Sequence, residues 1–164
     1  MRTRSAILTV LLAAASVSAS ASTEPPVDIP AAARAAKKVV VATVTNVESE
    51  FDVNEYGDRL IVSHVSYRVE ETLKGPSEPA GVVTLEGGSI GDLTLSVSDM
   101  PRMTRGERAV LFTQDSVQGR PVPHGRGRGV MKLDASDRVI GTTLTLDDVR
   151  AAVKGAQSER SGQR

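Results

Sequence analysis

Apolar and polar residues alternate most regularly between residues 61 and 73. Polar residues fill most of the even positions, and the apolar residues stand at odd positions: Ile61, Val65, Tyr67, Val69 and Leu73. A period of two predicts a half-buried β-strand. Because more than a dozen residues is long for an open sheet, the pattern favours a strand that bends around a small barrel.

Shorter apolar runs on either side of this strand predict further strands. The run 39–47 is β-branched almost throughout, and Ala109–Phe112 is apolar without interruption. Other strands are expected at 82–86, 93–97 and 130–133, with 138–140 as a hairpin partner of the last. Spacing of about ten residues is typical of all-β proteins. We therefore expect an all-β domain over residues 38–141, a small closed or partly open barrel of five or six strands.

The C-terminal region predicts a helix over residues 142–155. Thr145 is a candidate N-cap with Asp148 three residues later, and Lys154 and Gly155 are typical of a helix end. Three apolar residues share one face of this helix: Leu146, Val149 and Val153. Residues 156–164 contain no apolar side chain beyond Ala156, so we expect a disordered tail.

The N-terminal region has the features of a secretory signal peptide over residues 1–21. Arg2 and Arg4 precede an apolar stretch from Ala6 to Val17, and small residues allow cleavage after Ala19 or Ala21. The stretch is too short for a membrane anchor. We therefore expect export to a periplasm or to the medium. Residues 22–37 are expected to form a proline-containing leader with one or two helical turns before the first strand.

The composition excludes several classes of protein. Lys and Arg total 20 and Asp and Glu total 20, so a generally polycationic nucleic-acid binder is excluded. The chain has no cysteine, which excludes disulfide scaffolds, thiol chemistry, cysteine-ligated zinc and lipid attachment at a cysteine. No metal site, cofactor or catalytic residue is predicted, and the sparse aromatic content argues against a base-stacking surface.

The residues with candidate chemistry are few. His64 lies in the alternating strand among polar neighbours, where it is expected to be a solvated surface histidine. His124 precedes the string Gly125–Gly129, in which Arg126 and Arg128 offer bidentate donors for a carboxylate or a phosphate. The string also fits a flexible loop. His124, Arg126 and Arg128 are thus the candidate binding residues.

Three segments resemble the netrin and tissue-inhibitor-of-metalloprotease domains. These segments are KKVVVATVTNVES at 37–49, VSYRVEETLKG at 65–75 and TRGERAVLF at 104–112. The resemblance implies an OB-like barrel that acts by binding, with an exported protease as the most concrete partner. Inhibitors of that fold chelate zinc through an N-terminal cysteine, which this chain lacks, so that mechanism is not carried over.

Together, these patterns favour an exported, non-enzymatic binding or accessory module for another envelope or extracellular protein. Binding is expected at loops of one barrel end, such as 87–91 and 119–129. Two alternatives remain open. One is a small exported hydrolase that uses His124 or His64 with acidic partners, and the other is a polyanion-binding module that uses Arg126 and Arg128.

Overall fold

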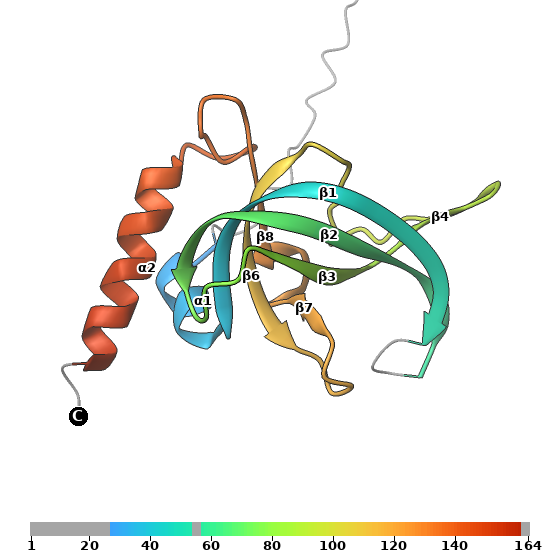
Figure 1. Cartoon of the computed structure of the whole chain (residues 1–164), viewed down its shortest axis with the longest axis horizontal. Helices are drawn as coiled ribbons and strands as arrows, with labels where there is room; N and C mark the ends of the chain where they lie inside the picture. Colours follow the sequence, from blue (N-terminus) through green and yellow to red (C-terminus); the bar gives the residue numbers. More distant parts are fainter. Residues whose placement is uncertain (1–26, 54–56, 162–164) are drawn as a thin grey trace, which may run out of the picture.

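The computed structural model describes residues 27–53 and 57–161, and its elements follow one another along a β-rich chain (Figure 1). The predicted signal peptide lies outside the described residues. In order, the elements are α1 Ile29–Ala35, β1 Lys38–Val53, β2 Arg59–Lys74, β3 Ala80–Glu86, β4 Gly88–Ile90, β5 Leu93–Leu95, β6 Arg108–Asp115, β7 Pro121–Pro123, the 3-10 turn η1 Arg126–Gly129, β8 Val130–Leu133 and α2 Leu146–Ser161.

The main sheet is antiparallel and strongly curved. Its order is β3-β2-β1-β6-β7, and β8 also pairs with β6. β1 and β2 form a long ribbon that arches over the molecule (Figure 1). Cα atoms of β3 and β7 approach within 8 Å, but no hydrogen-bonded pairing joins these strands in the described part of the chain. The β-rich fold with a C-terminal helix is confirmed, and the sheets are not closed into a barrel.

The sheet separates two apolar cores. On one face, Val39, Val41 and Phe112 pack with Ile29 of α1 and the apolar side of α2. The other face carries a second core that includes Val40, Val65, Leu85 and Leu111. β1 serves both cores because its first residues are buried on both faces.

The two helices begin at side-chain caps. Asp28 Oδ1 accepts a hydrogen bond from Ala31 N at 2.9 Å, and Pro30 occupies the first turn of α1. At α2, Asp148 Oδ2 accepts from Thr145 N at 2.8 Å while Asp148 N donates to Thr145 Oγ1 at 3.3 Å. This reciprocal pair is a capping box. It confirms Thr145 as the predicted N-cap, and the helix begins at Leu146 rather than at residue 142.

The predicted end of that helix at Gly155 is wrong. α2 continues to Ser161, so residues 156–161 of the expected disordered tail are helical. Ala156 is buried in the core beneath α2, and Gln157 Nε2 donates to Leu73 O at 2.9 Å. These contacts offset the roughly 1 kcal/mol that a glycine costs inside a helix.

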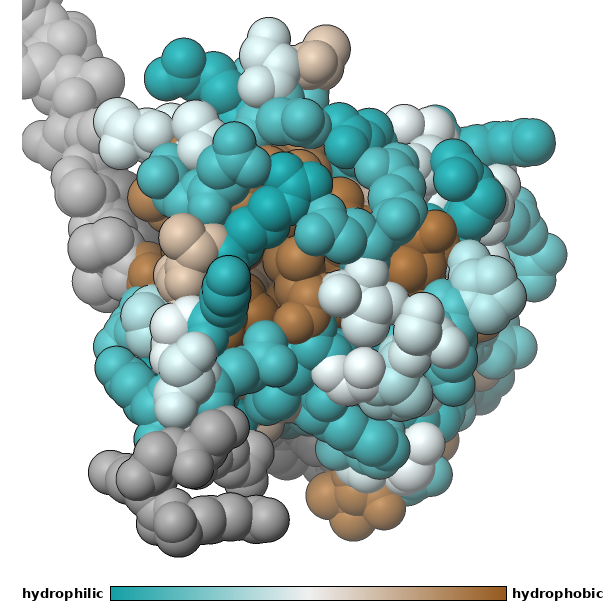
Figure 2. Space-filling model, turned by 60° about the vertical axis from the view of Figure 1, so that its left-hand side comes forward, coloured by the Kyte–Doolittle hydropathy of each residue, from teal (hydrophilic) through white to brown (hydrophobic). Residues whose placement is uncertain are grey.

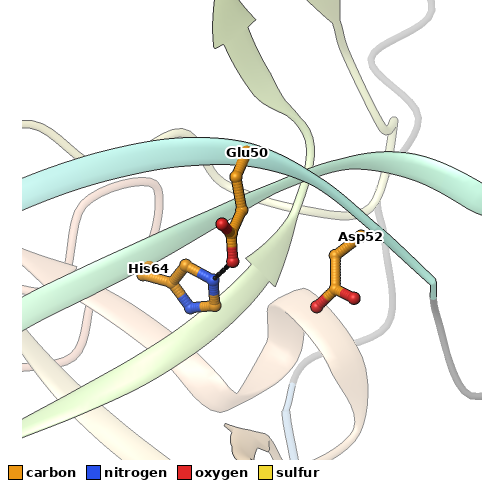
Figure 3. A group of neighbouring side chains, drawn as sticks. All are labelled: Glu50, Asp52 and His64. Atoms are coloured by element: carbon orange, nitrogen blue, oxygen red, sulfur yellow. Dashed lines mark hydrogen bonds and ion pairs between the residues drawn. The ribbon is translucent and has the colours of Figure 1, made fainter.

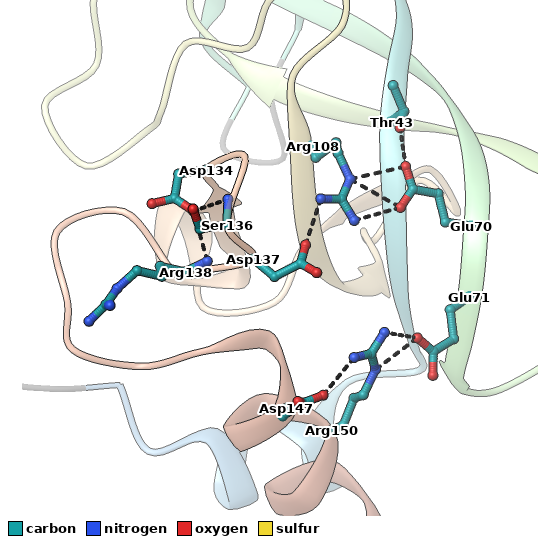
Figure 4. A network of polar contacts seen from close by, with 10 residues as sticks. All are labelled: Thr43, Glu70, Glu71, Arg108, Asp134, Ser136, Asp137, Arg138, Asp147 and Arg150. Atoms are coloured by element: carbon teal, nitrogen blue, oxygen red, sulfur yellow. Dashed lines mark hydrogen bonds and ion pairs between the residues drawn. The ribbon is translucent and has the colours of Figure 1, made fainter.

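Two of the predicted strands differ from those observed. The expected strand 93–97 shortens to β5, which pairs only with β4 in a separate hairpin. The expected hairpin partner 138–140 forms only isolated bridges, Leu133 with Val139 and Arg138 with Thr145. Its turn is instead held by the side chain of Asp134, whose Oδ1 accepts from Ser136 N and Arg138 N (Figure 4).

Ion pairs join the C-terminal region to the end of the β1–β2 ribbon that contains Glu70 and Glu71, which we call its near end (Figure 4). Arg108 donates to Glu70 at 2.9 Å and to Asp137 at 2.6 Å, and Arg150 of α2 donates to Glu71 at 2.6 Å. On the face shown in Figure 2, hydrophobic residues are visible in gaps between hydrophilic ones. Among the described residues, no helix combines the length and the apolar character needed to cross a membrane.

Candidate functional site

One half of the β1–β2 ribbon brings acidic residues and a histidine together. We call this the far half; it consists of residues 48–53 of β1 and their partners 59–64 of β2. Glu50 and Asp52 stand two residues apart on β1, so their side chains leave the same face of the strand. The register places His64 opposite Glu48 and Val62 opposite Glu50. His64 is therefore a diagonal neighbour of Glu50, and Figure 3 shows the three side chains on one side of the ribbon.

We call this group the His64 cluster (Glu50, Asp52 and His64), and hydrogen bonds hold each of its members in place. His64 Nε2 lies 2.8 Å from Glu50 Oε1, and His64 Nδ1 lies 3.2 Å from Thr84 Oγ1 on β3. Arg120 of the β6–β7 loop donates to Asp52 Oδ2. One ligand atom from each of the three cluster residues lies within 4.8 Å of the others.

A cavity of about 270 Å³ lies next to the His64 cluster. Thr84 and Arg120 belong to its lining and also contact His64 and Asp52, so these two residues link the cavity to the cluster. The rest of the lining mixes apolar and polar residues from β1, β2, β3, β6, β7, η1 and the neighbouring loops: Val53, Val62, Glu86, Met100, Gln114, Ser116, Gln118, Val122, Pro123, Gly125 and Arg126. This cavity with the cluster beside it is the candidate site.

The candidate binding residues from the sequence lie at or near this cavity. Arg126 lines it, and His124 Nδ1 lies 2.6 Å from Oε1 of Gln114, another lining residue. Arg128 belongs to the same 3-10 turn as Arg126 but is not among the described residues that line the cavity. The structure thus brings Arg126 and His124 to one place, while His64 approaches it from another strand.

Arg126 is held by acidic neighbours. Its Nη2 donates to Glu86 at 2.7 Å, and its Nε donates to Asp99. Hydrogen bonding to Asp99 raises the pKa of Arg126, and the same bond lowers the pKa of Asp99. These ion pairs neutralise the guanidinium locally, which disfavours polyanion binding through Arg126.

The other predicted binding loop, 87–91, borders a second cavity of about 230 Å³. Gly87, Gly88 and Ser89 line it together with Ser49 and Ser63. Gly88 has a φ of 144°, and a Cβ there would lie 2.4 Å from Ser63 Oγ, so the chain requires glycine at this point. Ser63 Oγ donates to Gly87 O at 2.7 Å, which closes this corner of the sheet.

Glu50, Asp52, Thr84 and Arg120 were not among the residues predicted from the sequence. His64 was predicted only as one of the two histidines of the alternative hydrolase. Glu50 and Asp52 show only an acidic pair at strand spacing, and their meeting with His64 depends on the register of β1 against β2. Comparison with known proteins adds no family: the chain matches no protein-family model, and no curated protein is significantly similar to it.

Proposed function

We propose that this protein is an exported binding module, built as a partly open OB-like barrel, that captures a side chain of a protein partner in the cavity beside the His64 cluster. Export rests on the signal-peptide features of residues 1–21. The strand order β3-β2-β1-β6-β7 and the close approach of β3 to β7 support the barrel. The resemblance to inhibitor domains favours an exported protease as the partner.

The cavity is the observation that carries this proposal. Its volume of about 270 Å³ is slightly below the roughly 300–1,000 Å³ of small-molecule sites, so it fits one anchoring side chain better than a whole ligand. Its walls combine apolar residues such as Val62 and Val122 with charged groups at Arg120 and Glu86. A buried anchor surrounded by polar groups is typical of protein interfaces.

Exposed apolar side chains border the same cavity. Val53, which lines it, is 44% exposed, and Val117, between the lining residues Ser116 and Gln118, is 90% exposed. A partner that covers Val53 and Val117 while inserting a side chain would remove both from water. This arrangement favours a macromolecular partner over a free small molecule.

The proposal is tested with the signal-cleaved chain immobilised as bait for periplasmic extract and culture supernatant. We expect one protein to be retained by the wild type and lost with the Val53→Arg/Val117→Arg double variant. The matched control is Leu93→Arg in the β4–β5 hairpin, where a leucine is 60% exposed away from the cavity lining. Retention of no protein, or equal retention by the double variant and the control, would contradict the proposal.

A second candidate function, hydrolysis, is favoured by one arrangement. The imidazole of His64 contacts the hydroxyl of Thr84 through one ring nitrogen and the carboxylate of Glu50 through the other. Nucleophilic hydrolases use a hydroxyl, a base and an orienting acid in this order. This function predicts cleavage of a chromogenic ester that His64→Ala abolishes and His124→Ala preserves. Absence of activity in the wild type, or equal activity in both variants, would exclude it.

A further inference from the structure

We propose that Glu50, Asp52 and His64 bind a divalent transition-metal ion of the zinc type. The inference concerns a site beside the cavity and is independent of the partner proposed above. His64 Nε2 and Glu50 Oε1 are 2.8 Å apart, and all three ligand atoms lie within 4.8 Å of one another. Two ligands at about 2.0–2.1 Å from one tetrahedral zinc ion are roughly 3.3 Å apart, so Glu50 and His64 are close to ligand spacing, and the Asp52 carboxylate must approach them by up to about 1.5 Å.

The chemistry of the three donors selects the kind of metal. One imidazole nitrogen and two carboxylate oxygens suit zinc and its first-row neighbours. Calcium and magnesium prefer sites made of oxygen ligands alone. Three protein ligands also leave at least one coordination position for water or for a group of a partner.

The surroundings of His64 orient it as a ligand. Its Nδ1 is hydrogen-bonded to Thr84 Oγ1 at 3.2 Å, which directs Nε2 towards the carboxylates. Metal-bound histidines commonly use their second nitrogen in this way. His64 lies on β2, which is paired on both sides, with β1 and with β3, so its backbone is held in place from two directions.

Arg120 supplies a test of the charge balance. Its guanidinium donates to Asp52 Oδ2, so one of the two carboxylates is already paired with a positive charge. A metal ion would add two more positive charges close to Arg120. Removal of the guanidinium should therefore strengthen metal binding, whereas removal of a ligand should weaken it.

The experiment is a titration of the signal-cleaved, chelator-treated full chain with Zn²⁺ by calorimetry, and with Co²⁺ by its visible absorption spectrum. We expect one equivalent to bind. His64→Ala and the milder Glu50→Gln should each weaken binding at least about tenfold. Arg120→Gln should strengthen it. The matched control is His124→Ala, which removes the other histidine of the chain and should leave binding unchanged.

Several results would overturn the metal proposal. They are an absence of binding to the wild type, equal binding by His64→Ala and His124→Ala, and weaker binding by Arg120→Gln. Circular dichroism of each variant separates loss of a ligand from loss of the fold. Because the measurement needs neither a partner nor a substrate, the fate of the proposed protein partner does not affect it.

Discussion

The two halves of the β1–β2 ribbon differ in what surrounds them. At the near half, β1 residues 38–42 are all buried, because helices cover one face and the second core covers the other. Along the far half, from Glu48 to Val53, β1 has no fully buried residue. The same pair of strands therefore stabilises the fold at one end and presents charged side chains at the other.

This difference shows how one ribbon can serve structure and binding. The near half is paired on both sides of β1, by β2 and by β6, and its ion pairs reach the C-terminal helix. The far half of β1 is paired with β2 alone, and its contacts to the rest of the chain include the Arg120–Asp52 ion pair. Substitutions in the far half should therefore change binding more than stability.

The largest difference between the two halves is expected when a phenylalanine is replaced by alanine in each region. Phe112 on β6 lies opposite Val39 of the near half and is 0% exposed, while Phe51 on the far half of β1 is 47% exposed. We expect Phe112→Ala to lower the free energy of unfolding by about 3–5 kcal/mol. Phe51→Ala should lower it by less than about 1 kcal/mol. Urea denaturation measures both, and equal losses would show that the two halves are equally important for stability.

The near half was largely predictable from the sequence because local patterns determine it. The β-branched run at 39–47 and the alternation up to Leu73 correspond to β1 and β2, and Thr145 with Asp148 fixes the start of α2. Errors arose where tertiary contacts override local preference. α2 passes through Gly155 because Ala156 reaches the core, a contact that the sequence does not reveal.

The candidate site was less predictable because it depends on register. Glu50 and His64 are 14 residues apart, and they meet because the far half lies in one unbroken register from Val53–Arg59 to Asn46–Ser66. A shift of this register by one residue would bring His64 to the other face, and the alternating pattern alone does not state which residue of β1 lies opposite it. Arg120 reaches Asp52 from 68 residues away. Of the residues in the His64 cluster, only His64 was recognisable from the sequence as a candidate for chemistry.

A smaller effect is expected in the pH dependence of stability, because the ion pair between Arg108 and Glu70 stabilises the near half. Hydrogen bonding to Arg108 lowers the pKa of Glu70 from its ordinary value of 4.5. A lowered folded-state pKa means that the unfolded chain takes up a proton first as the pH falls. The stability contributed by this pair is therefore complete above the ordinary pKa and is lost as the pH falls through the folded-state pKa.

Arg108→Met should remove this contribution. We expect the variant to be less stable than the wild type by about 1 kcal/mol near pH 7, because the side chains of Arg108 and Glu70 are partly exposed, 32% and 24%. The difference should shrink as the pH falls through the lowered folded-state pKa of Glu70, because its carboxylate then becomes protonated in the wild type as well. Urea denaturation at each pH measures it, with Arg105→Met, an exposed position in the turn before β6, as the control. A difference that stays constant over this pH range would mean that the ion pair with Glu70 does not stabilise the near half.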